Sequence, residues 1–261
     1  MVKKRIIPTL LLDGERLVKG VKFKNLRDVG HPVTSVSVYD AQVCDELIFL
    51  DIRPGRNGRK KTLEILARSS ETCFVPLCAG GGVSTIDDIR EFLRYGADKV
   101  VINTAAVLNP EFISNAAQKF GKQCVVVSID YIEKPSGERE VVIEGGGRPV
   151  GIDPYEQALK MANLGAGELV MTSVSRDGMR CGCDLDLIAR IKRKVSIPVI
   201  VRGGIGTLED FVKVFSETDA DAVAAGSIFH FTDQSPIKVR TWLNRAGVNI
   251  RIPAKEKLAF F

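Results

Sequence analysis

The stretch VPLCAGGGVSTIDDIREFLRYGADKVVINTA, residues 75–105, occurs a second time in this chain in a related form. Residues 197–227 read IPVIVRGGIGTLEDFVKVFSETDADAVAAGS, and the alignment matches Gly81 with Gly203. Each copy contains an apolar run, a glycine-rich turn, an amphipathic stretch that begins at a threonine, and a second apolar run. This order predicts a strand, a helix capped by the threonine, and a further strand.

The same spacing relates the segments that precede the two copies, because DELIFLDI at 45–52 resembles GELVMTSV at 167–174. Each half of the chain therefore contains four strand–helix units. Eight such units fit either a closed barrel or an open doubly wound sheet, and two equivalent halves favour an α/β fold of the (β/α)8 TIM-barrel type. The predicted parallel strands are 5–11, 46–51, 75–79, 99–103, 123–130, 168–172, 199–202 and 222–225.

The domain organisation follows from length. The chain has 261 residues, and a TIM barrel typically contains about 250, so residues 1–261 are predicted to form a single domain. Residues 131–150 form the one long insertion, which is interpreted as a hairpin after the fifth strand. Residues 248–261 form a C-terminal tail to which the sequence assigns no role.

Composition excludes several classes of function. The net charge of +5 is spread along the chain without a dense basic run, so an anionic small molecule is a better partner than nucleic acid. No apolar run approaches the roughly 20 residues that span a bilayer. The six cysteines lack metal-binding spacing. We therefore expect a cytoplasmic protein with reduced thiols, no metal site and no cofactor.

The glycine-rich turns predict a phosphate-binding barrel. In TIM barrels the loops after the strands build the active site. Glycine allows the backbone to approach an anion, and helix N-termini supply N–H donors. A single such turn can need glycine for its own conformation, whereas two matched turns beside hydroxyl groups favour phosphate. The predicted phosphate-binding residues are Gly81, Gly82, Asn103, Thr104, Asp177, Gly178, Gly203, Gly204, Gly226 and Ser227. The expected ligand is a phosphorylated small molecule, with one phosphate for each half-barrel.

Other polar residues near strand ends are candidates for chemistry. Asp130 ends the fifth predicted strand, and the pattern leaves open whether it is a general acid or base or a cap of its loop. Asp51 is a second candidate at the end of the second strand. Lys19 is expected in the loop after the first strand, where it would reach over the site. His31 and His230 are interpreted as structural.

Four charged residues stand at or near the starts of predicted strands, at the opposite end of the barrel. They are Arg5, Glu46, Lys99 and Glu168. We expect them to meet in a salt-bridged ring at the N-terminal face. From the charge pattern alone, a ring that simply closes the barrel is the favoured interpretation.

Across nearly the whole chain, the sequence resembles the cyclase subunit of imidazole glycerol phosphate synthase, the HisF family. The matching stretches are RIIP, LVKG, LRDVGHP, DELIFLDI, GGG, GADKVVINTAA, FGKQCVVVSID, RDG and SIFHF. The resemblance implies a HisH-like glutaminase partner on the N-terminal face, with ammonia passing through the charged ring as a gate. It also implies that Asp98 belongs to the docking face, that Lys19 is the lysine of a mobile catalytic loop, and that Asp130 is one catalytic carboxylate.

One departure from the family pattern concerns the second catalytic carboxylate. The family places it at the end of the first strand, where this chain has Leu11, and Asp13 does not fall into register. A leucine cannot exchange a proton, and loss of a positioned acid or base typically costs 10²–10⁴-fold in rate. Two lesser departures are Ser175, in place of an aspartate, and Arg202, in place of a small residue.

These changes resemble a HisF-like branch associated with acetamidino modification of surface sugars. The sequence therefore predicts the synthase subunit of a glutamine-dependent amidotransferase complex, which supplies ammonia to a separate sugar amidotransferase. One alternative is a genuine cyclase of histidine biosynthesis in which Asp51 or Asp13 replaces the missing acid. Another is a non-catalytic scaffold that only activates its glutaminase. Leu11 argues for the first interpretation over the second.

Overall fold

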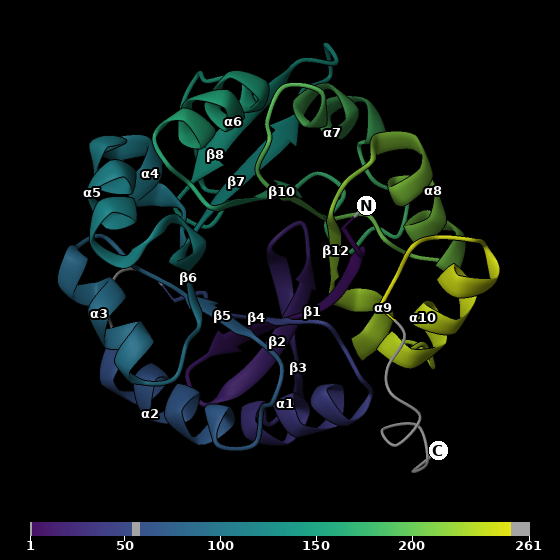
Figure 1. The fold of residues 1–261 in the computed structure, drawn as a ribbon, viewed down its shortest axis with the longest axis horizontal. Coiled ribbons are helices and arrows are strands. Elements are labelled where there is room, and N and C mark those ends of the chain that lie inside the picture. The colour runs from purple at the N-terminus through teal and green to yellow at the C-terminus, as the bar shows by residue number, and fades with distance from the viewer. Residues whose placement is uncertain (1, 54–57, 252–261) are drawn as a thin grey trace.

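The computed structural model describes residues 2–53 and 58–251, and it forms a closed barrel surrounded by helices (Figure 1). The barrel strands are β1 (Arg5–Asp13), β4 (Leu47–Asp51), β5 (Leu77–Gly80), β6 (Lys99–Ile102), β7 (Val125–Glu133), β10 (Glu168–Ser173), β11 (Val199–Arg202) and β12 (Ala222–Ala225). All neighbouring pairs of these strands are parallel, and pairing of β12 with β1 closes the ring. The predicted TIM barrel is confirmed.

The helices between the strands cover the outside of the barrel. They are α1 (Pro32–Ala41), α2 (Arg59–Ser70), α3 (Ile86–Arg94), α4 (Thr104–Leu108), α5 (Glu111–Phe120), α6 (Pro154–Asn163), α7 (Leu185–Lys192), α8 (Leu208–Thr218), α9 (Ser227–His230) and α10 (Pro236–Arg245), with a 3₁₀ turn at Lys122–Cys124. The repeat is visible in their capping. Thr85 and Thr207 cap their helices, as the sequence predicted, and each forms a reciprocal capping box with the aspartate three residues on.

Burial separates two apolar layers. A large outer core lies between the strands and the helices. A smaller cluster fills the barrel interior, and it consists of Ile7, Ile48, Cys78, Val101, Val126, Val170, Ile200, Ala222 and Ala224. Burial raises the pKa of the Cys78 thiol well above its usual range, so this thiol stays neutral. The interior is thus packed with side chains rather than open.

Two hairpins extend from the C-terminal ends of the barrel strands. β2 (Arg16–Val21) pairs antiparallel with β1 and with β3 (Lys24–Gly30). β8 (Arg139–Ile143) pairs antiparallel with β7 and with β9 (Arg148–Pro149), within the insertion at 131–150. The first hairpin corrects the sequence prediction, because Lys19 lies in β2 rather than in a loop.

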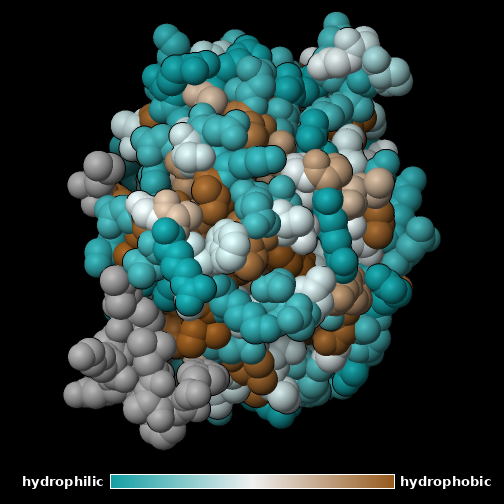
Figure 2. Space-filling model, turned by 90° about the vertical axis from the view of Figure 1, so that its right-hand side faces the viewer, coloured by the Kyte–Doolittle hydropathy of each residue, from teal (hydrophilic) through white to brown (hydrophobic). Residues whose placement is uncertain are grey.

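The C-terminal part of the chain packs back on the start of the barrel. Of the predicted tail 248–261, residues 248–251 are described, and the rest lies outside the described residues. The backbone N–H of Lys4 donates to the carbonyl of Asn249 at 2.9 Å. Figure 2 shows the side of the molecule that carries α8 and α10, where apolar residues form separate patches among hydrophilic ones. A groove there is lined by Leu208, Gln234, Ile237, Lys238, Thr241, Trp242 and Arg245. No helix of the described residues is long and apolar enough to cross a membrane.

A buried arginine fastens α10 to the barrel. The Arg240 guanidinium donates to the carbonyl of Val43 at 2.7 Å and lies 2.9 Å from the Asp45 carboxylate. Asp45 in turn accepts the backbone N–H of Ile6 at 2.8 Å. Since Arg240 and Asp45 are both almost fully buried, neither charge can be solvated if the other is lost.

We therefore expect Arg240→Ala to lower the free energy of unfolding by about 3–5 kcal/mol, because it leaves the Asp45 charge buried and unpaired. Chemical denaturation measured by circular dichroism tests this. Lys238→Ala is the matched control, since Lys238 lies on the same helix and pairs with Asp233 at an exposed site. The expected loss in free energy of unfolding for Lys238→Ala is about 0.5–1 kcal/mol. Equal losses in both variants would show that the Arg240–Asp45 pair does not hold α10 to the barrel.

Candidate active site at the C-terminal end of the barrel

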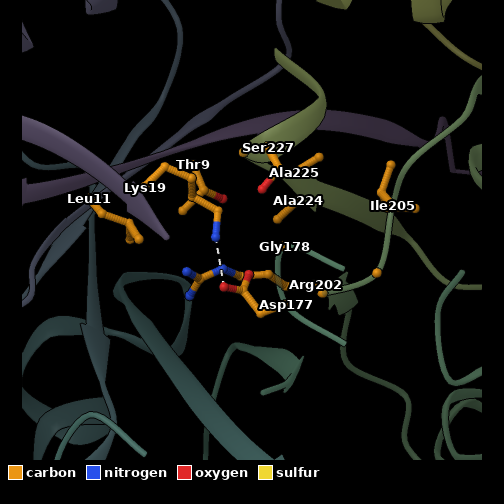
Figure 3. Close-up of a pocket in the computed structure, with 13 residues that line it drawn as sticks. Thr9, Leu11, Lys19, Asp177, Gly178, Arg202, Ile205, Ala224, Ala225 and Ser227 are labelled. Atoms are coloured by element: carbon orange, nitrogen blue, oxygen red, sulfur yellow. Dashed lines mark hydrogen bonds and ion pairs between the residues drawn. The ribbon is translucent and has the colours of Figure 1, made fainter. Parts of the chain in front are cut away.

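A pocket opens at the C-terminal ends of β1, β11 and β12 (Figure 3). It is lined by Thr9, Leu11, Lys19, Asp177, Gly178, Arg202, Gly203, Gly204, Ile205, Ala224, Ala225, Gly226 and Ser227. All the predicted phosphate-binding residues of the second half-barrel belong to this lining. The sequence-predicted catalytic positions Lys19 and Leu11 belong to it as well.

The glycines of this pocket are required by the packing of the turn itself. Gly203 and Gly204 have φ angles of 96° and 104°, which side chains rarely adopt. A Cβ atom at Gly203 would lie 2.5 Å from the carbonyl oxygen of Ser173, and one at Gly204 would lie 2.1 Å from that of Gly182. The turn therefore presses against two neighbouring backbones, which by itself accounts for glycine at both positions.

Lys19 and Asp177 form a buried ion pair inside the pocket. The Lys19 Nζ atom is 2.7 Å from the Asp177 carboxylate, and the Lys19 residue is only 3% exposed. Burial lowers the pKa of Lys19, with Asp177 opposing that shift and the positive charge of Arg202 adding to it. The backbone N–H of Lys22 also donates to the carbonyl of Asp177. Together these contacts fasten the β2–β3 hairpin over the pocket.

Leu11 occupies the position at which an acid was expected, and the two aspartates considered as replacements, Asp13 and Asp51, lie outside the pocket lining. Leu11 is buried and lines the pocket, whereas Asp13 is exposed at the end of β1. Asp51 is bound to its own loop, because Arg53 donates to its carboxylate at 2.7 Å and the Thr62 hydroxyl contacts the same oxygen. Neither aspartate is part of the pocket lining.

Asp130 lies just below the pocket, in the same row as Arg202. Strand register places Thr172 of β10 beside Asp130 of β7 on one side and beside Arg202 of β11 on the other. The Asp130 carboxylate accepts the Ser128 hydroxyl at 3.1 Å. Burial raises the pKa of Asp130, while the charge of Arg202 opposes the increase. A buried carboxyl with a raised pKa suits a general acid or base.

Arg202 is a polar residue of the site that the sequence did not predict as a binding residue, and it stood out only as a departure from the family pattern. Its side chain extends into the pocket toward the ends of Lys19 and Asp177 (Figure 3). It is only 6% exposed, and it forms no hydrogen bond or salt bridge with another described residue. Its guanidinium lies 5.7 Å from the ring centroid of Phe23, at the tip of the β2–β3 hairpin.

The glycine turn of the first half-barrel, at Gly81 and Gly82, is not part of this pocket lining. The Gly81 and Gly82 carbonyls accept the guanidinium of Arg59 at 3.1 and 2.8 Å, a contact that the sequence did not predict. The Asn103 amide donates to the carbonyl of Ser128, and the Thr104 hydroxyl accepts the backbone N–H of Glu144. These polar groups are engaged with the protein, so the two halves differ despite their common sequence pattern.

The charged ring forms at the N-terminal face, as predicted. Arg5 lies 2.6 Å from Glu46 and 3.1 Å from Glu168, and Lys99 lies 2.9 and 2.8 Å from the same two carboxylates. Burial alone would lower the pKa of Arg5 and Lys99, but the two glutamates reverse the effect and raise it. Burial also raises the pKa of Glu46. The ring is a closed alternation of charges around the barrel axis.

Asp98, expected on the docking face, has a structural contact of its own. Its carboxylate accepts the backbone N–H of Leu77 at 2.8 Å, and its own N–H donates to the Leu77 carbonyl. Asp221 makes the equivalent bond to Val199 at 2.8 Å. These bonds hold the starts of neighbouring strands together, which is sufficient to explain the aspartate.

The family model of histidine biosynthesis proteins matches residues 5–235 of this chain. The chain belongs to this family. The match runs from the first residue of β1 to the residue before α10, so it includes the whole barrel, the charged ring and the pocket. This membership supports a HisF/HisA-type TIM barrel of the kind that acts in histidine biosynthesis, in agreement with the resemblance found in the sequence.

The buried ion pair of the pocket should be strongly coupled. We expect Lys19→Met and Asp177→Asn each to lower the free energy of unfolding by about 3 kcal/mol, because each leaves a buried charge without its partner. The double variant should lose much less than the sum, which a double-mutant cycle measures. The pair Arg16–Asp28 in the same hairpin is half exposed and serves as control, with an expected coupling below about 1 kcal/mol. Equal coupling energies in the Lys19–Asp177 and Arg16–Asp28 cycles would show that the buried pair does not fasten the hairpin over the pocket.

Proposed function

We propose that this protein is the synthase subunit of a glutamine-dependent amidotransferase complex. It conducts ammonia from a HisH-like glutaminase through the barrel to a phosphorylated acceptor at the C-terminal end. The observation that carries this proposal is Leu11, which lines the pocket at the position of a catalytic acid. The chain combines the charged ring and the glycine-lined pocket with the loss of a group that cyclisation needs.

Phosphate binding in the pocket is supported by charge and backbone geometry. Among the residues that line the pocket, Lys19 and Arg202 bring two positive charges and Asp177 brings one negative charge. The glycine turn at 203–204 presents backbone without side chains to the same space. A buried site with an uncompensated positive charge attracts an anion strongly, because the interior screens charge less than water does.

Ammonia entry is supported by the ring and the atoms around it. The Glu46 Oε1 atom is buried without a hydrogen-bond partner among the described residues. The same holds for the Thr9 hydroxyl, higher along the barrel strand β1. Ammonia carries three N–H donors and no net charge, so it can satisfy such acceptors and cross the apolar interior without the cost of burying an ion. A salt bridge of the ring must open to admit it.

A protein partner at the N-terminal face is supported by exposed apolar side chains. Phe74 is 82% exposed and Val2 is 81% exposed. Both precede the barrel strands that follow them and therefore lie at the same end as the ring. A partner that covers this face would bury them and deliver ammonia directly to the ring.

For the acceptor we propose a precursor of a surface-glycan sugar that receives an acetamidino group, with a separate sugar amidotransferase forming the amidine. This step rests on the resemblance of the first-strand change to that branch. A genuine cyclase of histidine biosynthesis remains the second candidate, because buried Asp130 preserves one proton-exchanging group. The charged pocket weighs against a scaffold that only activates its glutaminase.

The missing acid gives the decisive test. With ammonia and the histidine-pathway intermediate as substrate, we expect the wild type to turn over no faster than the uncatalysed background reaction. Leu11→Asp should be at least 10²-fold faster, because it restores a group that can exchange a proton. Leu11→Asn is the control, with nearly the same shape and no titratable proton. Wild-type turnover at a normal rate would mean that another acid acts, and the cyclase would then replace the proposed function.

The proposed docking face is tested through Phe74, whose side chain is 82% exposed, so that its substitution is expected to leave the fold intact. We expect Phe74→Ser to weaken binding of the HisH-like glutaminase about 10- to 30-fold, as loss of an apolar hot spot does. Isothermal titration calorimetry measures this. Leu108→Ser is the control, since Leu108 is 61% exposed on α4, which follows the C-terminal end of β6. Asp98 is a poorer probe because its carboxylate holds Leu77. Unchanged affinity in Phe74→Ser would place the partner elsewhere.

A further inference from the structure

Arg202 is a buried cation that has no hydrogen-bond or salt-bridge partner among the described residues and lies 5.7 Å from the centroid of the Phe23 ring. The residue is 6% exposed, and its side chain extends into the pocket (Figure 3). A guanidinium has five N–H donors, and no Arg202 nitrogen is among the fully buried atoms without a partner, so its donors face the pocket. A group of this kind in a pocket is explained by a ligand that supplies the missing acceptors.

The charged neighbours of Arg202 do not supply those acceptors. Asp177 is already paired with Lys19 at 2.7 Å, and the repulsion between Lys19 and Arg202 contributes to the lowered pKa of the lysine. Asp130 is buried in the adjoining row and accepts the Ser128 hydroxyl. Its raised pKa means that burial outweighs the attraction of Arg202. The donors of Arg202 are therefore free to bind a second anionic group.

We propose that the pocket binds a diphosphate group, with one phosphate on the glycine turn at 203–204 and the adjoining phosphate on Arg202. This inference rests on the proposed phosphate site. Arg202, Gly203 and Gly204 line the same pocket, and the Arg202 side chain extends across it (Figure 3), so the two anion positions share one space. Two phosphates joined through one oxygen fit such positions, whereas the distant ends of a long ligand do not.

The chemistry of arginine favours this assignment. Its planar fork binds two oxygens of one phosphate at once, which a lysine cannot do. The rest of the site limits competition from water, since Leu11 forms an apolar wall and the Phe23 ring lies 5.7 Å from the guanidinium. Diphosphate esters include activated sugars, so the inferred ligand class agrees with a sugar acceptor. Arg202 would select this class over monophosphates.

Binding of pyrophosphate and of inorganic phosphate to the whole protein, measured by isothermal titration calorimetry, tests the inference. We expect the wild type to bind pyrophosphate about 10- to 100-fold more tightly, as a charged hydrogen-bond pair provides. Arg202→Ser should lose this preference and retain its affinity for phosphate. Arg245→Ser, which removes an exposed arginine outside the pocket, should behave as the wild type. Thermal unfolding of each variant establishes that it is folded.

The outcomes separate the inference from the function on which it rests. If Arg202→Ser weakens both anions equally, Arg202 binds a single phosphate and the diphosphate assignment is overturned. If the wild type binds phosphate without preferring pyrophosphate, the assignment also fails, while the proposed phosphate site stands. If the wild type binds neither anion, the phosphate site itself is wrong and the inference falls with it.

Discussion

Closure of the barrel is the constraint on which the rest of this structure depends. Once β12 pairs with β1, every second side chain of each strand is directed to one axis, and no edge remains through which water can enter. The side chains on that axis change in character from one end to the other. A ring of four charges lies at the bottom, an apolar cluster fills the middle, and Asp130 and Arg202 lie above it. Burial makes each charge depend on its neighbours, which is why the ring is fully paired.

The repeat made the barrel predictable, because strand–helix order and capping residues are local signals. The β2–β3 hairpin escaped prediction for an equally local reason. Its turn is formed by Lys22 and Phe23, with φ angles of 51° and 61°, where glycine, asparagine or aspartate would normally signal a hairpin. Lys19 was therefore predicted to lie in a loop, although it lies in strand β2 and is buried. The prediction that Lys19 belongs to the site did not depend on this error, but the burial of Lys19 could not be predicted from sequence spacing alone.

The two half-barrels share a sequence repeat, but their glycine turns have different surroundings in the structure. Both contain a glycine turn and both begin the next helix with the same capping box. In the first half, Arg59 binds the turn carbonyls and the β8–β9 region engages Thr104. Beside the turn of the second half, Arg202 and Lys19, which comes from the N-terminal β2, are directed into the pocket. Part of the difference lies within the repeat, where Arg202 aligns with Gly80. The rest comes from long-range contacts of residues outside the repeat, which a comparison of the two copies does not reveal. Arg202 was visible only through comparison with the family.

The interior thiol gives the barrel an intrinsic reporter of its own opening. Cys78 belongs to the axial cluster and is fully buried, and its raised pKa keeps the reactive thiolate rare. A thiol reagent can therefore modify it only when the strands separate transiently, in contrast to Cys181, which is exposed at the surface. The rate of Cys78 modification therefore measures how often the barrel opens transiently along its axis, which is the route proposed for ammonia. A partner or ligand that tightens the barrel would slow that reaction without touching the sulfur.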